Sequence, residues 1–208
     1  MGEYYIPAGP GEAEFTEKRS RFLGHVRGVD SEEQARDFIA AMKKEYYDAR
    51  HNCWCYILRD GPERYSDDGE PQGTAGIPML EVFRREGVSN LVCVVTRYFG
   101  GVLLGTGGLL RAYTKSAKDA LDAAGISMVR PWIQADIPCT YAMAERLKSE
   151  LGAMGAVTAD MDYAAQVTIK ALIPRENFES LSARIFDISN GTVRPVAKGE
   201  THRAVRIR

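Results

Sequence analysis

The chain has 208 residues, a hydrophobic fraction of 45%, a charged fraction of 26% and a formal net charge of −1. These proportions are those of ordinary globular proteins and argue against disorder, and the length suits a domain of about 130 residues followed by one of about 75. Basic and acidic residues number 17 and 19 before Pro131 and 10 and 9 from it onward. Neither half is polybasic, so any nucleic-acid contact must come from a local patch.

The sequence gives no sign of export or of membrane insertion. Its first residues lack a basic run followed by an apolar stretch, so no signal peptide is expected, and no 18 apolar residues run together. Its four cysteines stand mostly in apolar, strand-like stretches, which predicts reduced thiols rather than a disulfide framework. We expect a cytoplasmic protein. The four are Cys53, Cys55, Cys93 and Cys139.

The first domain is expected to alternate strands and helices. Ser31 with Gln34 resembles a capping box, Pro78 suits a first helical turn, and Gly87 suits a helix end. The continuous apolar run from Leu91 to Val95 is typical of a buried strand. The predicted elements are strands within 12–29, a helix from Ser31 to about Tyr47, a strand at 51–58, a helix from about Pro78 to Gly87, a strand at 91–95 and a helix at 108–124.

Residues 128–131 form the predicted domain boundary, giving domains at 1–130 and 131–208. The second domain shows the order β-α-β-β-α-β, which predicts a ferredoxin-like fold. Its predicted elements are a strand around Ile133 to Ile137, a helix with Met143, Leu147, Leu151 and Met154 on one face, strands at 157–163 and 165–172, a helix from Pro174 to Asn190, and a last strand from Thr192.

A Gly-rich, basic segment is the strongest candidate site. The stretch from Gly87 to Lys118 has four basic residues and no acidic one, and five of the nine residues at 100–108 are glycines. The glycines lead into a helix N-terminus, where free N–H groups favour an anion. The predicted anion-binding or nucleic-acid-binding residues are Arg97, Tyr98, Gly100, Gly101, Gly105, Thr106, Gly107, Gly108, Arg111, Lys115 and Lys118, with Lys18, Arg19 and Arg21 extending the patch. A solvated helix face with glycines that serve only backbone packing is the alternative.

A polar segment before the second helix is a second candidate. Its carboxylates could hold a divalent cation, although the spacing does not match an EF-hand, and the turn chemistry favours a solvated turn. His51, Cys53 and Cys55 would share one strand face, but this spacing favours buried thiols over a metal site. The residues of this predicted polar cleft are His51, Asn52, Asp67, Asp68, Glu70 and Thr74.

Known nucleotide motifs do not fit the Gly-rich segment. No Gly-Lys-Ser/Thr stands at Walker spacing, and the third glycine position of a dinucleotide fingerprint is Leu110. No nucleophile elbow or zinc-protease helix is present either. The sequence therefore predicts no cofactor, no metal and a binding protein rather than an enzyme.

Several motifs together resemble the YigZ/IMPACT family over essentially the whole chain. They are Lys18 to Gly24, His51 to Trp54, Ser66 to Pro71 with Gly73 to Gly76, and Val95 to Tyr113. Cys55 and Gln72 depart from the expected pattern.

The resemblance implies an α+β chain of two domains. The first would be a two-layer domain with a left-handed β-α-β unit, as in a small-subunit ribosomal protein and elongation factor G domain IV, and the second a ferredoxin-like domain akin to elongation factor G domain V. Both relatives touch ribosomal RNA, and eukaryotic IMPACT members regulate translation through protein contacts.

The leading hypothesis is a translation-associated regulator that binds RNA, the ribosome or a translation-related protein partner. Two alternatives remain open at this point. One is a metal-dependent hydrolase or nucleotide-using enzyme built on the acidic loop. The other is a pure protein-interaction module.

Overall fold

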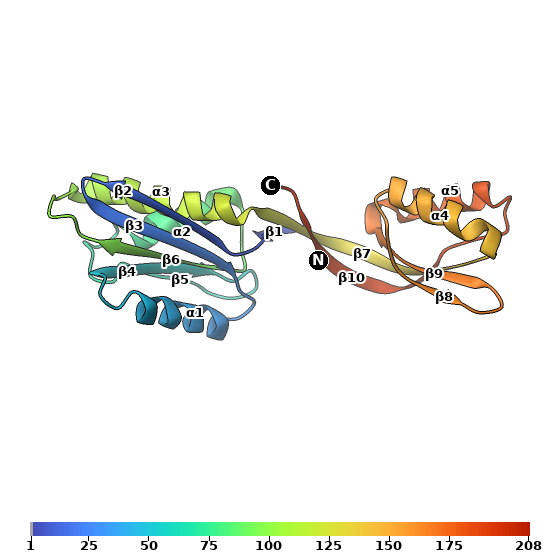
Figure 1. The fold of residues 1–208 in the computed structure, drawn as a ribbon, viewed down its shortest axis with the longest axis horizontal. Coiled ribbons are helices and arrows are strands. Elements are labelled where there is room, and N and C mark those ends of the chain that lie inside the picture. The colour runs from blue at the N-terminus through green and yellow to red at the C-terminus, as the bar shows by residue number, and fades with distance from the viewer. Residues whose placement is uncertain (1) are drawn as a thin grey trace. The chain divides into compact units, whose positions relative to one another are not determined.

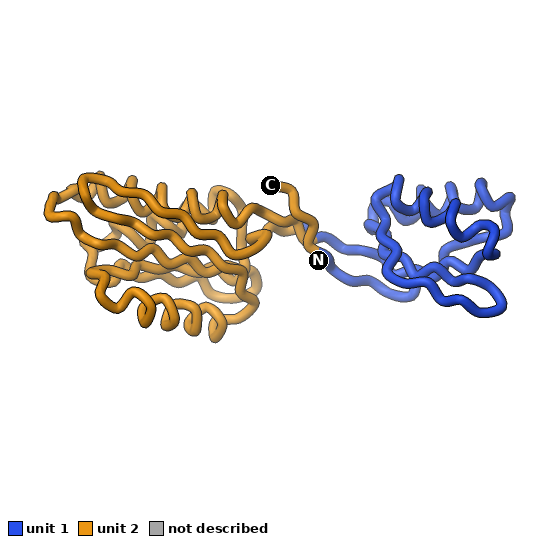
Figure 2. The backbone as a smooth tube through the Cα atoms, in the orientation of Figure 1, with its two compact units in different colours: residues 1–3, 130–203 blue, residues 4–129, 204–208 orange. Residues whose placement is uncertain are grey.

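The computed structural model describes residues 2–208, which form two compact units (Figures 1 and 2). The first unit contains residues 4–129 and the last five residues, 204–208. The second contains residues 130–203 together with Gly2 and Glu3. The expected α+β architecture of two domains is confirmed.

The first unit is built on a five-stranded antiparallel sheet of order β2-β3-β6-β4-β5. Helices α2 and α3 cover one face of the sheet and α1 covers the other, so the unit has two layers of core (Figure 1). The strands are β2 (Gly11–Glu17), β3 (Ser20–Gly28), β4 (His51–Ile57), β5 (Glu63–Ser66) and β6 (Leu91–Tyr98), and the helices are α1 (Glu32–Glu45), α2 (Gly76–Glu86) and α3 (Gly105–Ala124).

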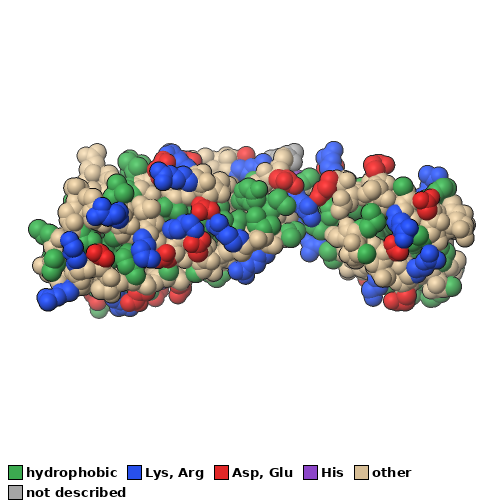
Figure 3. Space-filling model, turned by 90° about the horizontal axis from the view of Figure 1, so that it is seen from above, with side chains coloured by type: hydrophobic (Ala, Val, Ile, Leu, Met, Phe, Trp, Pro, Cys, Tyr) green, Lys and Arg blue, Asp and Glu red, His purple; other side chains and the backbone are tan. Residues whose placement is uncertain are grey.

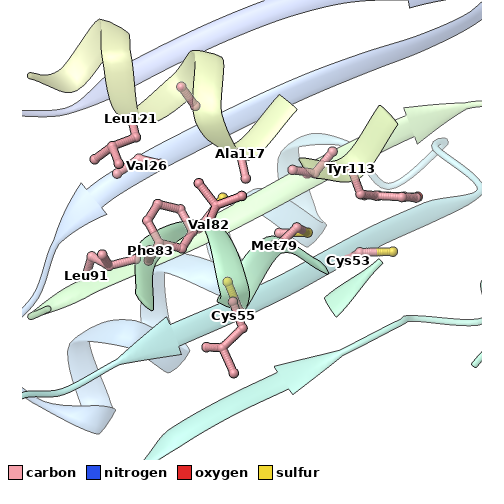
Figure 4. Packing of buried hydrophobic residues seen from close by; sticks show 14 of the residues in the cluster. Val26, Cys53, Cys55, Met79, Val82, Phe83, Leu91, Tyr113, Ala117 and Leu121 are labelled. Atoms are coloured by element: carbon pink, nitrogen blue, oxygen red, sulfur yellow. The ribbon is translucent and has the colours of Figure 1, made fainter. Parts of the chain in front are cut away.

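The larger core lies between the sheet and helices α2 and α3. Met79 and Phe83 of α2 and Tyr113 and Leu121 of α3 are fully buried there, between the helices and the sheet that contains Val26 on β3 (Figure 4). Glycines let α3 approach closely: a Cβ on Gly11 or Gly24 would overlap the backbone of α3. The helix therefore packs on β2 and β3 at a separation that only glycine allows.

Local signals placed most of these elements. Ser31 Oγ accepts a hydrogen bond from the Gln34 amide at 3.2 Å, as the capping box predicts, but the Gln34 side chain accepts from the amide of Asp30 rather than that of Ser31. Helix α3 begins at Gly105, three residues before the predicted start. The short strand β5 was not predicted.

The second unit has the strand order β10-β7-β9-β8, which is the ferredoxin-like order. Helices α4 and α5 supply Leu147, Leu151, Leu181 and Ile185 to its core. Its elements are β7 (Ile126–Cys139), α4 (Tyr141–Ala153), β8 (Val157–Tyr163), β9 (Val167–Pro174), a short 3-10 helix η1 (Arg175–Asn177), α5 (Phe178–Ile188) and β10 (Val196–Arg206).

The segment predicted as a domain boundary is not a loop. Strand β7 continues through it: residues 126–129 pair with the unpredicted strand β1 (Tyr4–Pro7), and residues 132–139 pair with β9. Arg130 and Pro131 fall between these two registers, which suits a proline because it lacks the N–H that a ladder needs. The last strand also begins later than predicted, at Val196 rather than Thr192.

The four cysteines are free and buried, and burial raises the pKa of Cys53, Cys55 and Cys139. Because the thiolate is the reactive form, we expect all four to react with a disulfide reagent at least about a hundredfold more slowly in the native protein than in denaturant. Timed thiol titration checks this, with total thiols counted in guanidinium chloride as the control. A thiol that reacts at the denatured rate in the native protein would contradict this packing.

Candidate functional site

The acidic turn between β5 and α2 is a folded structure rather than a solvated loop. Asp67 Oδ1 accepts hydrogen bonds from the amides of Ala75 and Gly76 at 3.0 and 2.8 Å, and its Oδ2 accepts from the amide of Gly73 at 2.8 Å. The Asp67 carboxylate thus caps the N-terminus of α2, where Ala75 offers no side-chain cap. This aspartate is structural.

Asp68 fastens the same turn to strand β4. Its carboxylate accepts from the Asn52 amide at 2.8 Å and from Lys43 Nζ at 2.6 Å, and its backbone carbonyl lies 2.8 Å from His51 Nδ1. Two other residues of the predicted polar cleft also bond within the fold. Asn52 accepts from Thr96 Oγ1 at 2.7 Å, and Thr74 Oγ1 donates to the carbonyl of Pro71 at 2.6 Å.

Glu70 forms a buried ion pair with Arg97. The distance from Arg97 Nη1 to Glu70 Oε1 is 2.6 Å, and only 6% and 3% of the two side chains are exposed. The Tyr113 hydroxyl donates to the same oxygen at 2.8 Å, and burial raises the pKa of Tyr113, so it remains a donor. The pair links the acidic turn, β6 and α3.

This buried and paired position corrects the predicted role of Arg97 as a phosphate contact. Its Nη2 donates to Ser20 Oγ at 3.4 Å, and its guanidinium lies 5.5 Å from the ring centres of both Phe22 and Phe99. Tyr98, the next residue, donates to Asp48 at 2.8 Å. Arg97 therefore organises the site from within the fold.

A cleft of ≈ 410 Å³ opens beside this ion pair. Glu70, His51, Arg97 and Phe99 line it, and Gly105 and Thr106 bring the N-terminus of α3 to it. The structure thus brings two of the six predicted cleft residues together with the Gly-rich segment. It adds Phe99, Leu103 and Arg50, which the sequence did not single out as ligand contacts.

The carboxylates of the acidic turn do not converge on one point. Asp67, Asp68 and Glu70 each bond to a different set of partners, as described above. Within residues 2–208 no group of three His, Cys, Asp or Glu side chains is arranged to hold a metal ion. The geometry gives the hypothesis of a metal-dependent enzyme no support.

The glycines of the Gly-rich segment at 100–108 have different structural roles. A Cβ on Gly100 would overlap the backbone of Arg19 and Ser20, so this glycine permits the hairpin between β2 and β3 to touch the segment. Gly101 and Gly105 have φ of +82° and +72°, a conformation that favours glycine. Gly107, by contrast, faces open space apart from the Arg111 side chain, and Gly108 packs closely on Leu104.

The hairpin that Gly100 supports carries two exposed cations. Glu17 pairs with Ser20, so Lys18 and Arg19 are the two central residues of the turn, with φ of 45° and 66°. Two positive φ values define a type I′ turn, for which Asn-Gly is the favoured sequence. Two residues with long basic side chains therefore occupy backbone positions that Asn and Gly would adopt with less strain.

A groove of ≈ 260 Å³ separates this turn from helix α3. Lys18, Arg111 and Lys115 line it together with Phe15 and Glu17. The basic patch is thus assembled from two segments that are distant in the sequence.

The cations of the predicted patch differ in their freedom. Within the described residues 2–208, Lys18, Arg19 and Arg111 have no ion-pair partner. The others are neutralised at close range: Arg21 pairs with Glu14, Lys115 with Asp119, and Lys118 with Asp122 and Glu86. Figure 3 shows the face that carries α3, where acidic side chains lie next to basic ones.

Two family models match the chain. The Impact N-terminal domain covers residues 18–121, and a domain of unknown function, DUF1949, covers residues 137–192. The IMPACT family member YigZ of Escherichia coli (strain K12) is 34% identical over 201 residues, which span 95% of this chain and 98% of that protein. The chain belongs to the IMPACT family.

Other IMPACT family members match over different lengths. The IMPACT family member YvyE of Bacillus subtilis (strain 168) is 33% identical over 92% of this chain and 89% of its own. Protein IMPACT of Mus musculus is 34% identical over 43% of this chain and 30% of its own. A crystal structure of a hypothetical protein matches 96% of this chain at 33% identity, with 98% of its own chain covered and a TM-score of 0.60. The acidic turn, the ion pair and the basic hairpin all lie in or beside the Impact N-terminal domain match.

No helix among residues 2–208 combines the length and apolar character needed to cross a bilayer.

Proposed function

We propose that this IMPACT family member is a translation-associated regulator that binds RNA of the translation machinery. The basic groove between the β2–β3 turn and α3 would contact the phosphates. The observation that carries the proposal is the type I′ turn made of Lys18 and Arg19, which packs against Gly100 of the Gly-rich segment. Strain retained at two exposed cations points to a task for those charges.

The chemistry of the groove suits a nucleic-acid backbone. Arg111 adds a third unpaired cation across the groove from the turn, and Lys115 Nζ lies 5.1 Å from the ring centre of Phe15. Cations without carboxylate partners are the ones that can exchange counterions for phosphates. The resemblance to domains that touch ribosomal RNA supports the same partner.

Removing these charges is expected to weaken RNA binding and its dependence on salt. The variant Lys18→Gln/Arg19→Gln/Arg111→Gln should lower the slope of log affinity against log salt by about 2, because each phosphate contact on a single strand contributes about 0.7. Binding of single-stranded RNA and of ribosomal subunits would be measured over a series of salt concentrations. A control removes the same charge elsewhere, at the exposed residues Lys44, Arg85 and Lys148.

A second variant separates binding from folding. Lys18→Asn/Arg19→Gly puts the favoured type I′ sequence into the turn, so the fold should be at least as stable while two cations are lost. We expect this variant to bind RNA more weakly than the native chain. Native affinity and salt slope in this variant, or no RNA binding by the native chain at low salt, would refute the proposal.

A further inference from the structure

The cleft beside the Glu70–Arg97 pair presents two hydrogen-bond acceptors. Glu70 Oε1 takes the hydrogen bonds from Arg97 and Tyr113, whereas Oε2 has no partner within residues 2–208, although 97% of the side chain is buried. Glu70 lines the cleft. Oε2 is therefore the oxygen of this carboxylate that is left to accept a hydrogen bond from a ligand.

His51 supplies the second acceptor. Its Nδ1 lies 2.8 Å from the carbonyl oxygen of Asp68, which can only accept, so Nδ1 carries the proton. In the neutral ring Nε2 is then an acceptor, and it lies 3.9 Å from Glu70 Oε1; both residues line the cleft. The fold thus fixes the tautomer in which Nε2 of the neutral ring is an acceptor, while Arg97, which also lines the cleft, donates its Nη1 to Glu70 Oε1.

A ligand that bonds to both acceptors needs two neighbouring donors. Among the nucleobases only guanine offers them on one edge, as the ring N1–H and the exocyclic amino group; adenine, cytosine and uracil each offer a single donor group there. Carboxylate acceptors suit that edge. Phe99, which lines the cleft, is 40% exposed and provides an aromatic surface for the base.

The N-terminus of α3, which also lines the cleft, suits the phosphate of the same nucleotide. Helix α3 is 20 residues long, and Leu104 at its N-cap has no side-chain acceptor, so the first N–H groups of the helix are free. Gly105 and Thr106 bring them to the cleft, and Arg50 adds a cation to its lining. A volume of ≈ 410 Å³ lies within the range of about 300–1,000 Å³ typical of ligand pockets.

We propose that the cleft binds one unpaired guanine nucleotide, with the guanine edge on Glu70 Oε2 and His51 Nε2 and the phosphate at the N-terminus of α3. This inference rests on the proposed function, because it names the nucleotide that the RNA presents. The basic groove would then supply affinity for any RNA, and the cleft would select the sequence.

The test compares oligouridine RNAs that carry a single central guanine, inosine or adenine. Guanine should bind about tenfold more tightly than adenine, and inosine, which lacks the exocyclic amino group, should lose most of that preference. In Glu70→Gln the amide oxygen must face Arg97 and Tyr113, because both are donors, so the amide nitrogen would replace Oε2 in the cleft. This variant should lose the guanine preference, and the exposed Glu33→Gln should keep it.

The NMR resonances of the His51 ring report directly which ligand occupies the cleft. Titration with 5′-GMP is expected to shift them, whereas 5′-AMP and acetylarginine amide should not. Equal binding of the three RNAs while RNA affinity persists would overturn the guanine site and leave the proposed function intact. If no RNA binds, the proposed function fails, and the 5′-GMP titration still tests whether the cleft binds a guanine nucleotide. A response to acetylarginine amide alone would assign the cleft to an arginine of a protein partner and overturn the inference.

Discussion

Replacing Arg97 by methionine is expected to lower the free energy of unfolding by about 3–5 kcal/mol, because the Glu70 carboxylate would stay buried without a cation. Both side chains are more than nine-tenths buried, and Arg97 also fills the space between Phe22 and Phe99. Methionine keeps much of this apolar contact, so the loss would report mainly the unpaired charge. Denaturant titration followed by circular dichroism measures it.

A double variant provides the matched control. Adding Glu70→Gln to Arg97→Met removes the buried charge but keeps an oxygen that accepts from Tyr113. The double variant should therefore recover most of the lost stability, since a neutral buried side chain that is hydrogen-bonded costs far less than an unpaired carboxylate. Equal stability of the single and double variants would show that the ion pair is not what holds the acidic turn against β6 and α3.

Replacing Gly100 by alanine is expected to cost about 3 kcal/mol of unfolding free energy, at the upper end of overpacking effects. The added Cβ would overlap the backbone of Arg19 and Ser20, and backbone cannot yield as a flexible side chain can. The β2–β3 turn must shift to accommodate it, so RNA affinity should fall as well. Thermal or denaturant unfolding and RNA titration measure the two effects.

The glycine at position 107 gives the control for this series. Its Cβ would meet only the end of the Arg111 side chain at 3.7 Å, and the residue lies within α3. Gly107→Ala should therefore leave the fold intact and raise stability by up to about 1 kcal/mol, because alanine loses less entropy in a helix. Similar losses in Gly100→Ala and Gly107→Ala would contradict the close approach inferred at Gly100.

The sequence was sufficient for the secondary structure where local chemistry decides it. The apolar alternation of β9 and the end of α2 at Gly87 are local patterns, and the structure confirms them. The short strands β1 and β5 were missed because four residues carry too little pattern. Both are strands only because a longer neighbour pairs with them: β7 in one case and β4 in the other.

The burial of Arg97 could have been inferred from strand periodicity. Cys93 and Val95 face the core beneath α2 and α3, and Arg97 continues their spacing of two on the same strand. The sequence offered no sign of its partner, because Glu70 lies 27 residues away on an irregular turn.

The sequence by itself determined the two-domain α+β organisation, most helices and strands, and the segments in which polar chemistry gathers. Only the tertiary structure decided which charges are available to a partner. Arg97 became an internal ion pair and Lys115 and Lys118 found carboxylates one helical turn away, whereas Lys18 and Arg19 remained free. The physical reason is that a charge is neutralised by whatever lies within a few ångströms of it. That neighbourhood depends on how the sheet, the turn and helix α3 pack together.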